Sequence, residues 1–229
     1  PSNSMQMLRQ YSVDAVIVAS STLPVSFAES FHEAGLRVVH SFGRLTDTPR
    51  INVLGIDNCE AGRIAARELL RRGYRKVGFL AGPLSATSTR DRHTGFAEEL
   101  GRHTDVSLSV SYAKAYSFEA GREEMTRLLR MGAAEAYFCG DDVLSIGALS
   151  AIEDAGLSVP QDVGILGLNN MKMAGWELVN LTTIHNPIDG IIKASVDLIE
   201  AMLKGEDGPA RSTTFACHVV ERGTLRPAP

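Results

Sequence analysis

The sequence has few of the features that mark several large classes of protein. It holds 23 Lys and Arg against 27 Asp and Glu, a net charge of -4, so it lacks the basic excess that binding to nucleic-acid phosphates requires. No apolar run approaches the roughly 18–20 residues that span a bilayer, and the polar start PSNSMQMLRQ lacks the layout of a signal peptide. We therefore expect that this chain by itself neither binds nucleic acid nor enters a membrane.

Cysteine pairs, metal-ligand spacings and common catalytic motifs are also missing. Cys59, Cys139 and Cys217 lie far apart and form no CxxC pair, so we expect buried, reduced thiols. The six histidines show no HExxH or comparable spacing, which argues against a metal site. The sequence contains no GxSxG, no P-loop and no GxGxxG after a predicted strand. We expect no cofactor, no metal and no enzyme of these classes.

Short β-branched runs alternate with longer amphipathic stretches along most of the chain. The runs are apolar on both faces, which is typical of strands covered by helices on both sides. The expected strands are 13–19, 36–40, 52–56, 76–81, 136–139, 163–168 and a late strand 212–220, and the expected helices are 24–34, 60–72, 88–102, 118–131, 142–155 and 188–204. This order predicts an α/β fold with parallel sheets. Because it exceeds what one sheet of five or six strands needs, it favours two similar lobes.

Polar residues follow most of the predicted strands. In parallel α/β sheets ligands collect at the carboxyl ends of strands, so these residues are candidates for binding. They are Ser20 and Ser21, Gly43 and Arg44, Asp57 and Asn58, the segment Gly82–Arg92, Gly140–Asp142, and Asn169 and Asn170. Hydroxyls, amides, carboxylates and arginines together suit a polyhydroxylated ligand.

The residues alone leave the role of several candidates open. Asp141 fits a helix N-cap and a ligand contact about equally well, whereas capping or packing is favoured for Asp142. The sequence pattern alone indicates that Arg92 is a solvated surface residue. Tyr116, between a strand and a helix, more simply packs than stacks on a ligand. Trp176 either covers the sheet end or lines a cleft.

Five ordered motifs resemble the effector-binding module of LacI/GalR-type bacterial transcription regulators, whose fold is similar to that of periplasmic sugar-binding proteins. The resemblance runs from about Val13 to Arg226, and the V-x-R-x-S/T pattern after the late strand favours regulators over secreted transport receptors. The motifs are GIDNCEAGRIAARELLRRGYRKVGFLAGP (55–83), RDRHTGFAEEL (90–100), AYFCGDDVLSIGALSAIEDAGLSVPQDVGILGLNN (136–170), LTTIHNP (181–187) and VVERGTLRP (219–227).

The resemblance implies two doubly wound parallel-sheet lobes of the periplasmic binding protein-like type I, joined by three crossovers. The N-terminal lobe would comprise 1–57 plus 187–218, and the C-terminal lobe 58–186 plus 219–229. A small ligand would bind in the cleft between the lobes, which close around it by a hinge.

The resemblance also assigns ligand-binding residues. The family's ligand arginine matches Arg92, which reverses the surface reading, and a flanking aromatic residue matches Tyr116. The family usually has Asn-Asp and Phe-Asp-Asp/Asn where this chain has Asp141-Asp142 and Leu168-Asn169-Asn170, so the carboxylate and the amide have traded places. We therefore expect a sugar-like effector with an altered hydroxyl pattern. The expected ligand set is Arg92, Asp141, Asn169, Tyr116, Ser20, Ser85, Ile56, Asn186 and Trp176.

Compared with the family, the sequence starts late. The helix-turn-helix headpiece and the first strands of the module have no counterpart, and the first family-like element is MQMLRQYSVDAVIVAS. The leading hypothesis is a cytoplasmic, homodimeric sensing module that controls operator DNA through such a headpiece. The alternatives are a solute receptor of a sugar transporter and, more remotely, an enzyme that uses Asp141, Asp142 and Arg92 on a sugar phosphate.

Overall fold

The chain folds into two compact units. The computed structural model describes residues 7–8, 10–206 and 208–228. One unit holds the described residues up to Asp57 together with Pro187–Ala216, and the other holds Asn58–Asn186 together with the described residues from Cys217 onward. The chain thus changes unit three times.

The last of these changes falls close to the expected boundary. Residues 217 and 218 group with the second unit. His218 pairs with His185, which belongs to the same unit, and this pairing explains the assignment. The lobe limits expected from the sequence stay a prediction.

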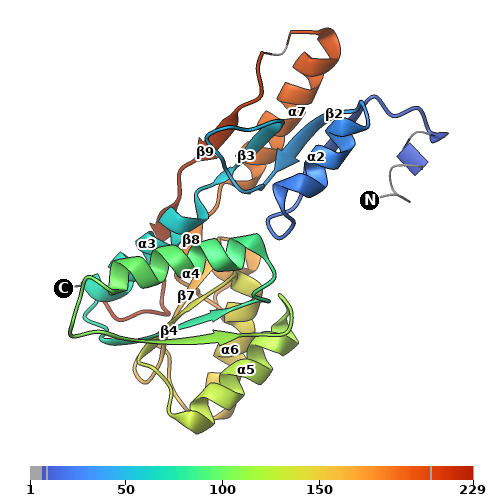
Figure 1. Ribbon diagram of the computed structural model, residues 1–229. Helices are drawn as coiled ribbons and strands as arrows, with labels where there is room; N and C mark the ends of the chain where they lie inside the picture. Colours follow the sequence, from blue (N-terminus) through green and yellow to red (C-terminus); the bar gives the residue numbers. More distant parts are fainter. Residues whose placement is uncertain (1–6, 9, 207, 229) are drawn as a thin grey trace. The chain divides into compact units, whose positions relative to one another are not determined.

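The first unit is built on a four-stranded sheet (Figure 1). Its elements are β1 Ala15–Ala19, β2 Arg37–Ser41, β3 Asn52–Ile56, β9 Ser212–Phe215, α2 Val25–Glu33 and α7 Ile188–Lys204. The strand order is β1-β2-β3-β9, and all neighbours are parallel. Both helices pack against β2, in which Val38–Ser41 are all buried. Unbroken burial is the pattern of a strand covered on both faces.

The second unit is built on a six-stranded sheet with two helix pairs (Figure 1). Its elements are β4 Lys76–Ala81, β5 Ser107–Tyr112, β6 Ala136–Cys139, β7 Gly164–Asn169, β8 Thr183–His185, β10 His218–Val220, α3 Asn58–Arg71, α4 Thr87–Leu100, α5 Phe118–Met131 and α6 Asp142–Asp154. The order is β10-β8-β7-β6-β4-β5, with only β10 antiparallel to its neighbour. Helix α3 packs on α4, and α5 packs on α6.

The elements follow from local sequence and from burial. Helix α5 starts where the Ser117 hydroxyl accepts a hydrogen bond from the Ala120 backbone N–H at 3.1 Å, which satisfies an otherwise unpaired donor. Helix α7 ends at Gly205, whose φ of +74° is the left-handed conformation that glycine adopts without steric cost. In the second unit, fully buried Phe79, Phe96 and Phe138 pack ring to ring between the sheet and α4.

The predicted α/β class and several element limits are confirmed. Strands 52–56, 76–81 and 136–139 and helices 118–131 and 188–204 have the expected bounds. The late strand expected over 212–220 is wrong as a single element. It is divided into β9, which pairs with β3, and β10, which pairs with β8 of the other sheet. The β-prone sequence is continuous there, but its two halves pair with strands of different sheets.

Two further expectations concern the thiols and membrane-spanning segments, and the edge of the first sheet can be described beside them. Cys139 is buried as expected, whereas Cys59 and Cys217 are only half-buried. Strand β1 lies at an edge of its sheet, with Ile17 39% exposed; part of the preceding segment, including PSNS, lies outside the described residues. Among the described helices, none combines the length and the apolarity needed to cross a bilayer.

Candidate ligand-binding site

Four neighbouring strands of the second unit end at one edge of its sheet. Strands β4, β6, β7 and β8 are parallel neighbours, so their carboxyl ends lie side by side. The residues at or directly after these ends are Gly82, Gly140, Asn169 and Asn186. Ligands of open parallel sheets bind outside this edge. We call it the carboxyl edge, and it is the candidate site.

Arg92 is a buried arginine with a fixed orientation at the carboxyl edge. It lies on α4 and is 4% exposed. Its Nε donates to Asn58 Oδ1 at 2.8 Å, and its Nη1 donates to the Gly140 carbonyl oxygen at 2.7 Å. These bonds use only part of the five N–H donors of a guanidinium. The other donors suit two ligand hydroxyls or one carboxylate.

Apart from Arg72 Nη2, which contacts Glu221 at 2.7 Å, two buried polar atoms in the second unit have no hydrogen-bond partner among the described residues. They are the Oγ of Ser88, which is 1% exposed, and the Oδ1 of Asn186, which is 7% exposed. Ser88 precedes Arg92 by one turn of α4, so the two side chains share a helix face. Because buried polar groups are nearly always hydrogen-bonded, both atoms are candidates for contact with a bound molecule.

Tyr116 packs its ring against the ends of β4 and β6. A Cβ added at Gly82 would lie 2.3 Å from the Tyr116 ring, and one added at Gly140 would lie 3.2 Å from it. The Tyr116 hydroxyl also forms a hydrogen bond with Thr89 Oγ1 at 2.5 Å. The packing reading of Tyr116 is thus confirmed, and its half-buried ring also borders the carboxyl edge.

The two adjacent aspartates have different environments. Asp141 is the N-cap of α6 and accepts from the Leu144 N–H at 2.8 Å. Burial raises the pKa of Asp141, while that hydrogen bond and the charge of Arg92 oppose the rise. Asp142 is fully buried, accepts from the Met171 N–H at 2.7 Å and from Thr183 Oγ1 at 2.6 Å, and burial raises its pKa to about 6. Asp142 therefore packs inside the unit, as its sequence context indicated.

The structure joins some of the predicted site residues by direct contacts and not others. Arg92 binds the carbonyl directly before Asp141, and Asn186 Nδ2 donates to Asn169 Oδ1 at 3.2 Å. No hydrogen bond or ion pair within the described part of the chain joins Ser85 or Trp176 to these residues. The Ser85 carbonyl accepts from Arg90 instead, and Trp176 is 62% exposed after the short 3-10 helix η1 Lys172–Gly175.

Two predicted ligand residues belong to the first unit. The Ser20 hydroxyl accepts from the Thr22 and Leu23 backbone N–H groups, each at 3.2 Å, and so caps a local turn after β1. Ile56 is the last residue of β3 and is 5% exposed. Their contact with a ligand stays a prediction.

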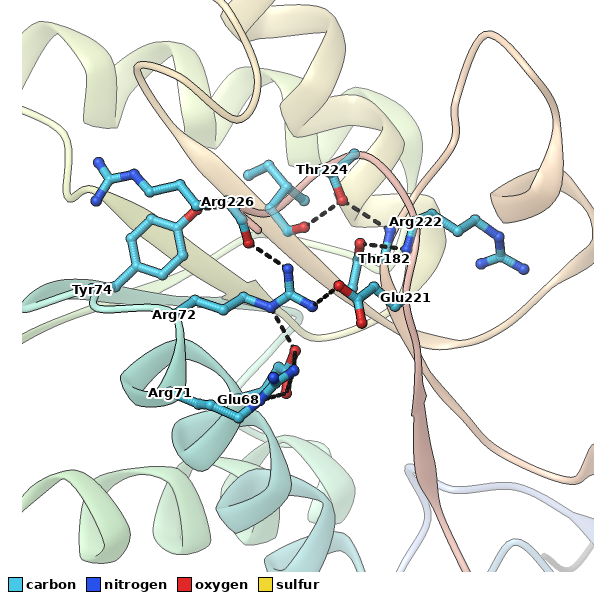
Figure 2. A network of polar contacts seen from close by, with 10 residues as sticks. Glu68, Arg71, Arg72, Tyr74, Thr182, Glu221, Arg222, Thr224 and Arg226 are labelled. Atoms are coloured by element: carbon cyan, nitrogen blue, oxygen red, sulfur yellow. Dashed lines mark hydrogen bonds and ion pairs between the residues drawn. The ribbon is translucent and has the colours of Figure 1, made fainter. Parts of the chain in front are cut away.

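A buried polar network holds the C-terminal segment on the second unit (Figure 2). The Arg72 side chain, 1% exposed, contacts Glu68 at 2.6 Å and Glu221 at 2.7 Å and donates to the Arg226 carbonyl. Thr224 Oγ1 accepts from the Thr182 N–H and donates to the Ile165 carbonyl. The motif VVERGTLRP is therefore the means by which the returning chain is fixed to α3, β7 and β8.

The site offers binding groups rather than reactive ones. No cluster of three or more His, Cys, Asp or Glu suited to a metal ion occurs among the described residues. Burial raises the pKa of Cys139 to about 12, so its thiol stays protonated near neutral pH. What the carboxyl edge presents is a guanidinium, a hydroxyl, amides, a carboxylate and an aromatic ring.

The chain passes three times between two α/β units, and the second unit has a polar carboxyl edge. These features are typical of periplasmic binding protein-like folds, which bind small molecules. The sequence profile described as the periplasmic binding protein-like domain matches residues 66–225. The chain belongs to this family. Its similarity to repressor sequences supports the assignment to the effector-binding domain of a LacI-family transcriptional regulator.

The sequence relatives include repressors, and the solved structures share the fold. The chain is 29% identical to the HTH-type transcriptional repressor PurR of Klebsiella pneumoniae, over 98% of this chain and 67% of the relative. Its fold is similar to a dimeric Lac repressor with a C-terminal deletion, with a TM-score of 0.88, 23% identity, and coverage of 98% of this chain and 83% of that one. A complex of the transcriptional regulator CelR with cellobiose gives a TM-score of 0.86, 24% identity, and coverage of 97% and 69%.

The expected ligand set left out several residues near the carboxyl edge that the sequence had offered only as general candidates after strands. Ser88 lies four residues before Arg92, and this helical spacing was a signal that could have identified it. Asn58 followed a predicted strand, but no pattern paired it with Arg92 on another helix. The contacts of Asn170 with His185 and Arg222 join segments 15 and 52 residues apart, and no local pattern indicates them.

Proposed function

We propose that the carboxyl edge of the second unit binds a polar, sugar-like effector. The observation that carries this proposal is the set of buried groups left with unused hydrogen-bonding capacity: the Arg92 guanidinium, Ser88 Oγ and Asn186 Oδ1. Together they supply donors, a hydroxyl that both donates and accepts, and an acceptor, and Tyr116 adds an aromatic surface. A molecule with several hydroxyl groups matches this set, and the cellobiose complex of a structural neighbour supports the same class.

The chain acts in this proposal as a sensor and not as a catalyst. The effector alters the operator affinity of an attached helix-turn-helix domain within a homodimer in the cytoplasm. The relatives named as repressors and the dimeric neighbour support this. Linkage requires that the effector bind the DNA-competent and DNA-incompetent states with different affinities.

The binding site is tested by calorimetry with a small panel of ligands and a pair of arginine variants. The panel contains cellobiose, D-glucose, D-glucuronate and adenosine. We expect Arg92→Ala to weaken binding of the best ligand about 10- to 100-fold, because hydrogen bonds from a charged donor contribute about 1.5–3 kcal/mol. Arg90→Ala, an exposed arginine on the same helix, is the matched control and should bind like the wild type. Undiminished binding by Arg92→Ala would contradict the site.

Ser88→Ala separates a loss of binding from a loss of folding. Because Ser88 Oγ has no partner in the described chain, its removal should leave the free energy of unfolding unchanged or slightly higher. Ligand affinity should fall about fivefold, the value of one neutral hydrogen bond. Equal loss of stability and affinity would show that Ser88 serves the fold.

A further inference from the structure

The turn formed by Asn169, Asn170 and Met171 is strained and is held at every residue. Asn169 has a φ of +116° and Asn170 a φ of +54°, both in the left-handed half of conformational space that costs free energy for residues other than glycine. Asn186 donates to Asn169, and Asp142 accepts from the Met171 N–H. Asn170 contacts two further side chains. Each residue of the turn is therefore held in its backbone conformation by a contact with another part of the chain.

The two partners of Asn170 determine the direction of its amide. Arg222 Nη2 lies 2.7 Å from Asn170 Oδ1, and a guanidinium can only donate. The Asn170 oxygen therefore faces Arg222, and its NH2 group faces His185 Nδ1 at 3.2 Å. That NH2 group can only donate, so His185 Nδ1 must carry a lone pair. Arg222 is itself fixed, because its Nη1 donates to the Leu181 carbonyl at 2.7 Å.

We propose that Arg222, Asn170 and His185 form a clamp that holds the turn 169–171 in place only while His185 is unprotonated at Nδ1, so that acidification weakens effector binding. The clamp residues are positioning residues: they orient Asn169 at the carboxyl edge and need not touch the ligand. The part that concerns the effector rests on the proposed function, whereas the state of His185 does not.

The groups around His185 give the direction of the effect. His218 on β10 is its register partner, with ring centroids 4.9 Å apart. Arg222 and Asp142 also contact the turn, and the exposed Lys172 follows it directly in sequence. Burial and the neighbouring His218 lower the pKa of His185. A proton added to His185 would remove the acceptor for Asn170 and would place positive charge near His218 and Arg222. The clamp is therefore closed at neutral pH and opens as the pH falls.

The clamp is tested without any ligand by long-range proton–nitrogen NMR of the histidine rings. The His185 signals are identified by their absence in His185→Asn. We expect the wild type to show Nε2–H and a bare Nδ1 near neutral pH. Asn170→Ala should move the titration of His185 to higher pH, because the neutral ring loses its donor, while the signals of histidines other than the neighbouring His218 stay unchanged. A proton on Nδ1 in the wild type, or an unchanged titration in Asn170→Ala, would overturn the clamp.

The coupling to the effector is tested by calorimetry with the best ligand of the panel at about pH 7.5 and about pH 5, the range in which histidine changes charge. Wild-type affinity should fall severalfold at the lower pH. His185→Asn places an amide oxygen near the position of Nδ1 and should remove most of the pH dependence, whereas the exposed His103→Asn should keep it. Asp142→Asn should also keep it, because His185 remains. An equal pH effect in His185→Asn and the wild type would contradict the coupling, and absence of any panel binder would count against the proposed function alone.

Discussion

Asp142 is a fully buried carboxyl group, and the burial of its charge has a cost that can be measured. Its two oxygens accept from the Met171 N–H and from Thr183, and both bonds favour the ionised form. Burial outweighs them and raises the pKa to about 6, against an ordinary value of 3.8. In the pH interval between these values the folded state binds more protons than the unfolded state, so this group stabilises the fold less as the pH rises.

The pH dependence of stability tests the state of Asp142. From pH 4 to pH 6 the wild type should lose about 2 kcal/mol relative to Asp142→Asn, since each pH unit between the two pKa values corresponds to at most about 1.4 kcal/mol. Urea unfolding at several pH values measures this difference, and comparison with the variant cancels the opposite contributions of Glu124 and Glu135, whose pKa values are lowered. A constant difference over this range would show that Asp142 ionises normally.

At the scale of elements, the C-terminal segment shows how a short peptide is fixed to a distant helix. Arg72 at the end of α3 is the centre of that attachment, because its buried guanidinium joins Glu68 and Glu221 and binds the Arg226 carbonyl. Without Arg72 the largely buried Glu68 carboxylate would keep only its contact with Arg71, and the Arg226 carbonyl would lose its donor.

Substitution of Arg72 should therefore destabilise the second unit strongly. We expect Arg72→Ala to lower the free energy of unfolding by about 3 kcal/mol. Arg122→Ala is the control, since the Arg122–Asp154 pair is half exposed and should contribute less than about 1 kcal/mol. Urea unfolding at neutral pH would measure both changes in the free energy of unfolding. If the two variants lose the same amount, the network around Arg72 contributes no more than a surface pair.

Elements that the sequence predicted well have local causes. Helix 118–131 has a serine cap and ends before Gly132, and strand 52–56 is a short apolar run between polar segments. Strand β8 is only three residues long and was not expected as a strand, since so short a run has no period of its own. The division of 212–220 into β9 and β10 depends on partners more than 30 residues away, which no local pattern encodes.

The same distinction holds for the site. Arg92 is buried, so the surface position that the residue pattern alone favoured is wrong, whereas its role in ligand binding, which the family motif implies, stays a prediction. The roles of Ser88 and of the clamp were not predictable, since they arise from burial and from contacts between separate elements. Asp141 shows the intermediate case: its capping bond follows from local sequence, and its contact with a ligand stays a prediction.

At the scale of the whole molecule, the acidic balance and the absence of basic patterning fit the sensing part of a regulator. The two units interleave along the chain, and the chain spans 67% of the length of the PurR relative. The central claim is that a polar small molecule binds at the carboxyl edge of the six-stranded sheet.

A crystal structure with the best ligand of the panel tests this claim most directly. We predict electron density for the ligand at the carboxyl edge, with hydrogen bonds to the Arg92 guanidinium, to Ser88 Oγ and to Asn186 Oδ1. A ligand bound elsewhere, with these three groups still lacking a partner, would contradict the claim.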